Sequence, residues 1–429
     1  MKVDYLIIGN SVAGVLAIEG IRERDPKGEI LVVSEEPFEN YSRPLISYFL
    51  GGRIPRERMV FRDSAFYRDM RADVLSGTRA ASLDFANREV VLAGGKKTGY
   101  GKLLLATGGK PFIPAIEGVS PEIKGVFSFS GLQDALDLKA HIEEMSVTEA
   151  IVLGAGLIGL KAAEGLLMRG VRVTLVEMAD RILANTFDLK GSTIMEELLV
   201  RHGSTVIKND TIASITRSQG RIEAVILKSG RTLSTKCLVI AVGVRPNTDL
   251  VQGTQIEMNR GIRVNDRMET NIPGVFAAGD VAESPEFFER KHALMAIWPI
   301  AARTGRISGI NMAGGQRHYQ GLFPMNAVQV LDLPTISFGI TDPKDPEFHV
   351  IERHEPARSF YRKLVLKDNR LVGAILIGEI ERAGIYGLLI RERIDVAPFE
   401  KELLSDTFGF LMLPKEFRKH MVTGEGIEV

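Results

Sequence analysis

Short apolar runs in this chain alternate with helix-like patterns, and the first run opens the sequence. Apolar positions dominate residues 3–8, a glycine-containing turn follows at 9–14, and spaced apolar positions at 15–21 predict a helix. A second apolar run at 30–33 then ends in acidic residues. This order predicts a strand, a helix and a parallel strand.

The turn Gly9-Asn10-Ser11-Val12-Ala13-Gly14 has the composition of a phosphate-binding turn. Gly9 permits a tight turn, small Ser11 lets the backbone approach a pyrophosphate, and Gly14 lets the helix pack on the strand. The N–H groups of the helix N-terminus then face the negative charge. The next strand ends in Ser34-Glu35-Glu36, and a carboxylate at this position is placed to hold an adenosine ribose. Glycine-rich turns also occur without a ligand, so this motif alone is a weak signal.

The same pattern occurs again near the middle of the chain. A strand at 151–153 leads into Gly154-Ala155-Gly156-Leu157-Ile158-Gly159, and a helix ends at Gly170. The following strand finishes at Glu177, about 20 residues after the glycines. A carboxylate here accepts the ribose hydroxyls and repels a 2′-phosphate, which favours NADH over NADPH. Arg181 lies close enough in the sequence to leave NADPH open.

The remaining pattern predicts three further parts. Alternating runs at 74–105 predict an antiparallel meander. Buried strands are expected at 103–106 and 236–243, and both end in similar glycine-containing segments, which we interpret as paired crossovers between domains. A strand runs into Gly279-Asp280, and a helix begins near Trp298. From 321 onward the alternation predicts a separate α+β domain, with helices expected at 385–392 and 401–410.

Composition narrows the function classes. The 429 residues contain 54 Lys+Arg and 54 Asp+Glu, which argues against a general nucleic-acid or anionic-membrane binder. No apolar run is long enough to span a membrane and no signal peptide is visible, so a cytoplasmic location is expected. The lone Cys237 sits in an apolar strand and cannot form an intramolecular disulfide, a cysteine-ligated cluster or a structural zinc site. No metal site is predicted.

Three segments in this order, 9–14, 154–159 and Val-Phe-Ala-Ala-Gly-Asp at 275–280, resemble the FAD-dependent pyridine nucleotide–disulfide oxidoreductase superfamily over nearly the whole chain. The resemblance implies an α/β fold with two Rossmann-like, three-layer dinucleotide-binding domains and a C-terminal α+β interface domain. The FAD domain is expected to be discontinuous, at 1–112 and 246–320. The NAD domain is expected at 113–245 and the interface domain at 321–429.

The resemblance also implies which residues contact the cofactors. Asp280 would bind the ribityl or pyrophosphate region of FAD, Glu35 its ribose, and Ala80 its adenine through the backbone. Trp298 would lie at the pyrimidine end of the flavin, although a core tryptophan is an equal alternative. The expected FAD contacts are Gly9, Ser11, Ala13, Gly14, Glu35, Arg43, Ala80, Thr107, Gly108, Gly279, Asp280 and Trp298. The expected NAD and crossover contacts are Gly154, Gly156, Leu157, Ile158, Gly159, Glu177 and Gly243.

One segment, Tyr41-Ser42-Arg43-Pro44-Leu45-Ile46-Ser47, departs from part of the superfamily. Members that do peroxide or thiol chemistry place a redox cysteine here, where this chain has Arg43 or Pro44. The sequence resembles instead the rubredoxin reductase, ferredoxin reductase and nitrite reductase large-subunit branch. That branch often has a lysine where this chain has Tyr48, and many relatives have a glutamate where it has Lys161. We infer that the positive charge near the flavin N5 and nicotinamide is Lys161; an ordinary solvated lysine is the alternative.

The resemblance implies an FAD-dependent NAD(P)H:acceptor oxidoreductase, a flavoprotein with Lys161, Arg43 and Pro44 as candidate catalytic residues. Hydride passes between NADH and FAD, and a one-electron iron–sulfur carrier such as rubredoxin or ferredoxin takes the electrons. The alternatives are an FAD/NAD-binding subunit attached to an iron–sulfur sister subunit, an NADH oxidase, or a non-catalytic FAD-binding scaffold. A homodimer and a hetero-complex are both left open. The C-terminal segment, apolar at 408–414 and basic at 415–420, is expected to pack on its own domain, with a docking surface as the alternative.

Overall fold

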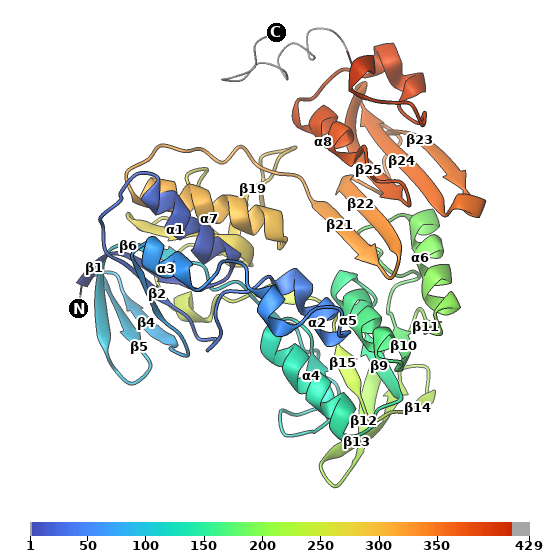
Figure 1. Cartoon of the computed structure of the whole chain (residues 1–429), viewed down its shortest axis with the longest axis horizontal. Coiled ribbons are helices and arrows are strands. Elements are labelled where there is room, and N and C mark those ends of the chain that lie inside the picture. The colour runs from blue at the N-terminus through green and yellow to red at the C-terminus, as the bar shows by residue number, and fades with distance from the viewer. Residues whose placement is uncertain (1, 414–429) are drawn as a thin grey trace. The chain divides into compact units, whose positions relative to one another are not determined.

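The computed structural model describes residues 2–413 and is shown in Figure 1. Its contacts divide the chain into two compact units, which we describe separately. The first comprises Met1–Met178 and Gly203–Phe323, and the second comprises Ala179–His202 and Pro324–Val429. The domain boundaries expected from the sequence stay predictions.

The N-terminal lobe of the first unit is built on a seven-stranded sheet in the order β3-β2-β1-β6-β5-β4, with β18 also paired to β6. The parallel part contains β1 (Lys2–Ile8), β2 (Ile30–Val33), β3 (Ala72–Leu75), β6 (Lys97–Leu105) and β18 (Val275–Ala277). The antiparallel part, β4 (Ala80–Asp84) and β5 (Glu89–Leu92), joins β6 as the expected meander. Because β18 pairs with β6, this lobe is discontinuous in sequence. Strand β2 is entirely buried, and β1 is buried except at Lys2 and Asp4.

Two helices from opposite ends of this lobe's sequence, α1 (Val12–Arg22) and α7 (Trp298–Met312), lie side by side in Figure 1. Their backbones approach closely because glycines stand at the crossing. A Cβ at Gly305 would overlap the carbonyl oxygen of Ala13, and one at Gly309 would overlap that of Ala17. This crossing holds the N-terminus of α1 against the carboxyl ends of the strands.

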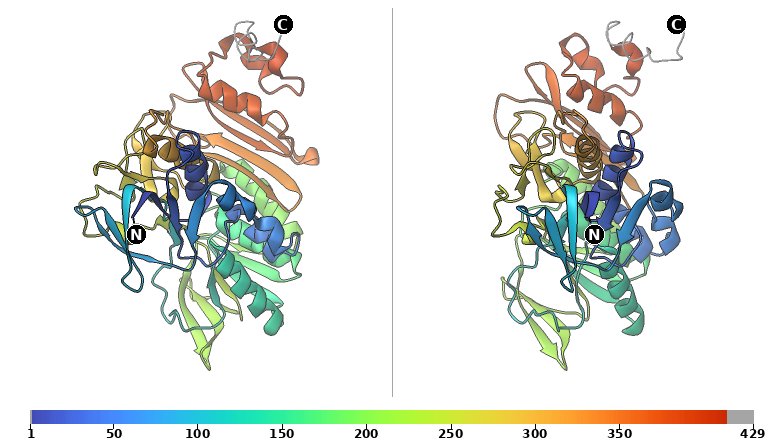
Figure 2. Two further views of the ribbon diagram at one scale, coloured as in Figure 1. Left: turned by 60° about the vertical axis from the view of Figure 1, so that its left-hand side comes forward. Right: turned by 90° about the vertical axis from the view of Figure 1, so that its left-hand side faces the viewer.

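The second lobe of the first unit has a five-stranded parallel sheet in the order β11-β10-β9-β15-β8. Its strands are β8 (Val126–Ser128), β9 (Glu149–Leu153), β10 (Arg172–Val176), β11 (Thr205–Ile207) and β15 (Leu238–Ile240). The accompanying helices are α4 (Leu132–Glu144) and α5 (Leu157–Met168). An antiparallel sheet of β12 (Ile212–Ser218), β13 (Arg221–Leu227) and β14 (Thr232–Ser234) projects from the lower end of this unit in both views of Figure 2.

Short elements connect the two lobes and complete the first unit. The crossovers pair as β7 (Gly109–Pro111) and β16 (Val244–Pro246), as expected from their similar sequences. Helix α2 (Ile46–Leu50) of the first lobe packs against α4 and α5 of the second, as Figure 1 shows. The other short elements are the 3₁₀ turns η1 (Arg43–Leu45), η2 (Arg56–Met59), η3 (Asp249–Val251) and η4 (Gly279–Val281), helix α3 (Ala65–Asp69), and the strands β17 (Ile262–Arg263), β19 (Ala282–Pro285) and β20 (His292–Leu294).

The second unit contains a five-stranded antiparallel sheet in the order β21-β22-β25-β24-β23. The strands are β21 (Met325–Val330), β22 (Leu333–Gly339), β23 (His349–Glu355), β24 (Phe360–Lys367) and β25 (Arg370–Ile377). Helices α6 (Leu189–Arg201) and α8 (Ala383–Arg391) and the 3₁₀ turns η5 (Pro356–Arg358), η6 (Ala397–Glu402) and η7 (Phe410–Met412) complete it. Buried Asp188, which caps α6, accepts hydrogen bonds from Tyr361 at 2.7 Å and Lys363 at 2.8 Å and so ties that helix to the sheet.

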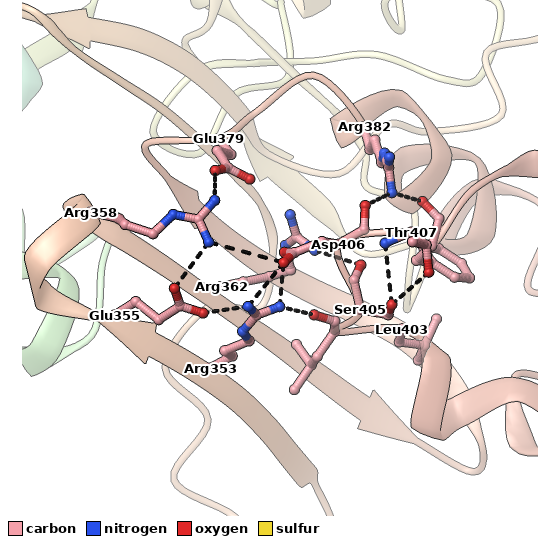
Figure 3. A network of polar contacts seen from close by, with 12 residues as sticks. Arg353, Glu355, Arg358, Arg362, Glu379, Arg382, Leu403, Ser405, Asp406 and Thr407 are labelled. Carbon is pink, nitrogen blue, oxygen red and sulfur yellow. Dashed lines mark hydrogen bonds and ion pairs between the residues drawn. The ribbon is translucent and has the colours of Figure 1, made fainter.

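The helix expected at 401–410 is wrong, and Figure 3 shows the reason. Arginine side chains take the backbone carbonyl groups that a helix would use: Arg353 donates to Leu404 O at 3.2 Å, Arg362 to Ser405 O at 3.3 Å, and Arg382 to Asp406 O. The Ser405 hydroxyl also accepts from Thr407 N. Side chains that bond to the backbone in this way compete with helix formation. The basic positions expected at 415–420 lie outside the described residues.

The predicted fold class is confirmed: an α/β chain with Rossmann-like parallel sheets, a discontinuous first lobe and a C-terminal α+β part. Among residues 2–413, no helix combines the length and the apolar character that a membrane crossing requires.

Candidate functional site

A cavity of about 760 Å³ lies in the first unit and is lined by both lobes. It lies at the carboxyl ends of parallel strands, where ligands bind in open α/β sheets, and its volume suits an organic ligand. The expected site residues that line it are Gly9, Ser11, Ala13, Glu35, Arg43, Pro44, Ala80, Thr107, Gly108, Leu157, Ile158, Lys161, Gly279, Asp280 and Trp298. The expected residues outside its lining are Gly14, Gly154, Gly156, Gly159, Glu177 and Gly243.

The first glycine turn forms one wall of this cavity. Gly9 has φ +116°, and a Cβ there would overlap the carbonyl oxygen of Ala106. Gly14 supports the turn from beneath, because a Cβ on it would overlap the carbonyl oxygen of Gly9. Ser11 is the extended N-cap of α1 and makes no side-chain cap hydrogen bond. Ser11, Val12 and Ala13 at the start of α1 line the cavity. The N-terminus of a helix favours an anion, so the predicted pyrophosphate contact stays compatible with this position.

Residues expected at the adenosine and at the crossover of the FAD site lie along the neighbouring strand ends. The Glu35 side chain is 67% exposed, with its carboxylate 4.0 Å from Arg79, so it sits at the rim. Thr107 donates a hydrogen bond to Asn247 O at 2.7 Å, which joins the two crossover segments. Gly108 has φ +68° and no atom within 4 Å of the position of a Cβ, so the backbone is open to a ligand there. These features fit an extended dinucleotide such as FAD.

At the other end of the cavity, Arg43 connects the two lobes. Its guanidinium donates to Ser130 O at 2.9 Å and forms an ion pair with Glu36. It also lies 5.6 Å from the centre of the Tyr41 ring. Burial raises the pKa of the nearby Asp280 carboxyl, and the positive charge of Arg43 opposes that rise. The segment 41–47 therefore places a cation, and no thiol, against this end of the cavity.

Sequence reasoning missed several of these cavity contacts. Glu36 faces Arg43 inside the cavity, whereas its neighbour Glu35 points to the rim. Tyr41 accepts a hydrogen bond from Leu132 N, the first residue of α4, at 2.9 Å. The one feature of the sequence that points to this contact is the capping pattern at the start of α4, where the Asp134 side chain accepts a hydrogen bond from Gly131 N at 3.0 Å. That capping pattern marks a helix N-terminus, but it does not identify the tyrosine that the helix will meet.

Lys161 projects from α5 into the cavity lining. Its ammonium forms an ion pair with Glu164, whose side chain is fully buried, and lies 4.3 Å from the centre of the Tyr48 ring. Tyr48 belongs to α2 of the first lobe, so the ammonium contacts both lobes. Helix α5 crosses α2 closely, because a Cβ at Gly165 would lie 2.9 Å from Leu50 Cδ2. The geometry fixes an ammonium paired with a buried carboxylate at the cavity lining, and its role in tuning a bound cofactor stays a prediction.

The glycines of the second turn lie outside the cavity lining, which Leu157 and Ile158 of the same turn reach, and the turn has the same construction as the first. Gly154 has φ +97°, and a Cβ there would lie 2.6 Å from Ala241 O. A Cβ at Gly159 would overlap Gly154 O, whereas one at Gly156 would meet no atom within 4 Å. The Glu177 carboxylate accepts from Ala155 N at 2.7 Å, inside the turn. The turn and its acid thus meet as the sequence spacing predicts.

Known proteins resemble this chain over nearly its full length. Residues 3–305 match the family model described as pyridine nucleotide-disulphide oxidoreductase, and residues 324–394 match that of the rubredoxin NAD+ reductase C-terminal domain. The epsilon subunit of NADH-dependent phenylglyoxylate dehydrogenase from Aromatoleum evansii is 32% identical over 406 residues, covering 94% of each chain. NADH-rubredoxin oxidoreductase from Clostridium acetobutylicum is 26% identical over 397 residues, covering 91% of this chain and 94% of that protein. A solved NAD-dependent persulfide reductase from A. fulgidus has a TM-score of 0.85 and 25% identity, covering 92% of this chain and 78% of that one.

Proposed function

This chain belongs to the pyridine nucleotide-disulphide oxidoreductase family, and from that premise we propose that it passes electrons from NADH to a small iron–sulfur protein. It is an FAD-dependent NAD(P)H oxidoreductase, and the expected cofactors, FAD and NAD(H), are confirmed. Bound FAD would supply the chemistry of accepting a hydride from the nicotinamide and releasing the electrons one at a time. The named acceptor and the assembly are our proposals.

The observation that carries the proposal is the cavity shared by the two lobes. It runs from the α1 turn to Lys161 of α5, so one ligand can contact both the first lobe and the helix that follows the second glycine turn. Hydride transfer needs chiefly placement of the two rings, which a cavity between two nucleotide lobes supports. In this arrangement the α1 turn would hold pyrophosphate, and Lys161 would place its ammonium beside the reacting rings. Arg43, paired with Glu36 of its own lobe, joins the two lobes through its bond to Ser130 O.

The lone cysteine supports a one-electron acceptor over a thiol acceptor. Cys237 precedes β15 in the second lobe and is fully buried, and burial raises the pKa of its thiol to about 12. A buried, protonated thiol is a poor nucleophile and cannot relay an electron pair. The relative from C. acetobutylicum is named for rubredoxin, and the C-terminal match is to a rubredoxin reductase domain. Both similarities favour an iron–sulfur carrier.

Anaerobic rapid mixing with NADH, and separately with NADPH, tests the proposal. With NADH, we expect the flavin absorbance to bleach either within the dead time of the mixing or in a single fast phase. With NADPH, we expect the bleaching to be slower. Subsequent addition of an oxidised rubredoxin or ferredoxin should restore the flavin absorbance. A flavin that NADH does not bleach would contradict the enzyme, and a bleached flavin that neither iron–sulfur protein reoxidises would contradict the acceptor.

The role of Lys161 needs its own variant. Lys161→Met removes the ammonium but keeps much of the side-chain volume, and we expect a changed rate of flavin bleaching and a shifted flavin midpoint potential. Lys139→Met is the matched control, because Lys139 is also paired with a glutamate of its own helix, Glu143, but does not line the cavity. Equal rates and potentials in both variants would remove Lys161 from the site.

A second candidate function is supported by a specific similarity. The relative from A. evansii, matched over 94% of each chain, is named as a subunit of a larger dehydrogenase. We therefore keep a hetero-complex with an iron–sulfur sister subunit as the alternative assembly. Sedimentation of the enzyme purified from its native cells tests this: a complex larger than a homodimer would favour the subunit.

We propose a cytoplasmic location, supported by the single buried cysteine.

A further inference from the structure

The segment 53–62, which we call the rim segment, carries an unusual concentration of positive charge. It contains Arg53, Arg56, Arg58 and Arg62 against one acid, Glu57, and so has a net charge of +3. Arg53, Arg56 and Arg58 are exposed. The whole chain has a formal net charge of zero, so this segment stands out from the average composition.

Backbone hydrogen bonds hold the rim segment against the cavity wall. Ser42 N donates to Met59 O at 2.8 Å, and Phe61 N donates to Asn40 O at 3.3 Å. Tyr41, which lines the cavity, pairs with Val60 between these two bonds. Met59 is 1% exposed and anchors the segment from beneath. The backbone that carries these charges is therefore held next to the cavity.

Aromatic rings connect the rim arginines to the cavity lining. The Arg56 guanidinium lies 5.2 Å from the centre of the Phe38 ring, and Phe38 lines the cavity. Phe61 packs edge to face on Trp298, with ring centres 5.4 Å apart, and Trp298 also lines the cavity. The Arg53 guanidinium lies 5.7 Å from the centre of the Tyr48 ring. Stacking reduces the freedom of these long side chains before a partner arrives.

Most of the rim arginines are not neutralised by an ion pair. Among residues 2–413, no carboxylate lies within ion-pair distance of Arg53, Arg56 or Arg58. Arg62 is the exception, with Glu19 at 2.8 Å. Arginine and aromatic residues are enriched among the few residues that contribute most of the binding energy in protein interfaces. An unneutralised positive surface also attracts an acidic partner over about a Debye length, roughly 8 Å at physiological salt.

We propose that the rim segment is the docking surface for a small acidic iron–sulfur protein, which receives electrons from the cavity directly behind it. This inference rests on the proposed function and adds the location and charge of the partner's contact. In the balanced reaction, NADH and two oxidised one-electron carriers give NAD+, one proton and two reduced carriers. The positive rim attracts the carrier, and Val60, 36% exposed, offers an apolar contact within the same segment.

The test is the double variant Arg56→Glu/Arg58→Glu, assayed with three acceptors under steady-state NADH. With an acidic ferredoxin, we expect kcat/KM to fall at least about tenfold and its dependence on salt to weaken, because rim charges act mainly on association. With the basic acceptor cytochrome c, kcat/KM should rise. With a neutral quinone, and in anaerobic flavin bleaching by NADH, the variant should match the wild type.

Two further variants separate the rim charge from other effects. Lys228→Glu/Arg231→Glu changes the same amount of charge at an exposed turn between β13 and β14, and should leave all three acceptors unaffected. Arg56→Lys/Arg58→Lys keeps the charge and should retain most of the ferredoxin activity. An unchanged ferredoxin rate in the Glu variant, or an equal fall in the Lys228/Arg231 control, would overturn the docking surface. If wild-type enzyme bleaches with NADH but reduces no iron–sulfur protein, the proposed acceptor fails as well, and the rim proposal falls with it.

Discussion

The two glycine turns of the first unit have nearly the same backbone but different surroundings. Gly9 and Gly154 both adopt positive φ, at +116° and +97°, and each is pressed against a carbonyl oxygen of a neighbouring strand end. Ser11 and Gly156 are both extended N-caps that make no side-chain cap hydrogen bond. Residues 9–13 of the first turn line the 760 Å³ cavity, whereas the second turn contributes Leu157 and Ile158 and its glycines lie outside the lining.

The acids beside the two turns show what this difference means. Glu177 bonds to Ala155 N within the second turn, whereas Glu35 lies at the rim beside Arg79. A turn enclosed in a cavity suits a cofactor that stays bound, and an open turn with its acid in place suits a nucleotide that must enter and leave at each turnover. We therefore expect changes in the first turn to affect flavin content and changes in the second to affect nucleotide kinetics.

The largest effect is expected from Gly9→Ala. The new Cβ would overlap Ala106 O and would also force a non-glycine residue into positive φ, which alone costs about 1–2 kcal/mol. We expect the purified protein to contain less than about a tenth of the wild-type FAD, measured by the ratio of flavin to protein absorbance. Gly94→Ala is the control, since Gly94 has φ +86° but no atom within 4 Å. Equal flavin loss in both variants would show that φ strain, and not the turn, is responsible.

Gly159→Ala should damage the second turn while the flavin stays bound. A Cβ here would overlap Gly154 O, so the helix must shift away from the turn. We expect normal FAD content and a fall of about tenfold or more in the rate of flavin bleaching at limiting NADH. Gly170→Ala, at the other end of α5 with no atom within 4 Å, should bleach at the wild-type rate. Loss of FAD in Gly159→Ala would contradict the independence of the two turns.

Much of this comparison was predictable from sequence because the signals are local. Six consecutive residues specify each turn, and the apolar patterns on either side of them predict its strands and helix. The contacts that join the lobes were not predictable, because Arg43 meets Ser130 from 87 positions away. Likewise, the apolar spacing at 401–410 resembled a helix, but arginines from strands β23 and β24 take its carbonyl groups. Local pattern specifies elements, whereas long-range side-chain contacts decide which element prevails and what faces the cavity.

An intermediate effect is expected from Glu177→Gln. Loss of the negative charge removes the repulsion of a 2′-phosphate and weakens the acceptor for the ribose hydroxyls. We expect kcat/KM to fall several-fold for NADH and to rise for NADPH, with unchanged FAD content, measured by steady-state quinone reduction. Glu35→Gln is the matched change in the first lobe and should leave the preference between the two nucleotides unaltered. A preference for NADH that survives in Glu177→Gln would assign the discrimination to another residue.

The smallest effect is expected when the middle residues of the turns are exchanged, as Ser11→Gly and Gly156→Ser. Both positions have an extended backbone with negative φ, and a Cβ at Gly156 meets no protein atom within 4 Å, so each residue fits the other turn. Replacing an N-cap serine by glycine costs only a few tenths of a kcal/mol, so the melting temperature should change by about 2 °C or less in either variant. The hydroxyl of Gly156→Ser would point into space that is free of protein atoms and where we expect the nucleotide to bind. The KM for NADH should therefore rise about two- to threefold while FAD content stays constant. A large fall in melting temperature together with an unchanged KM would mean that the open space beside Gly156 serves packing, and would remove the distinction drawn between the two turns.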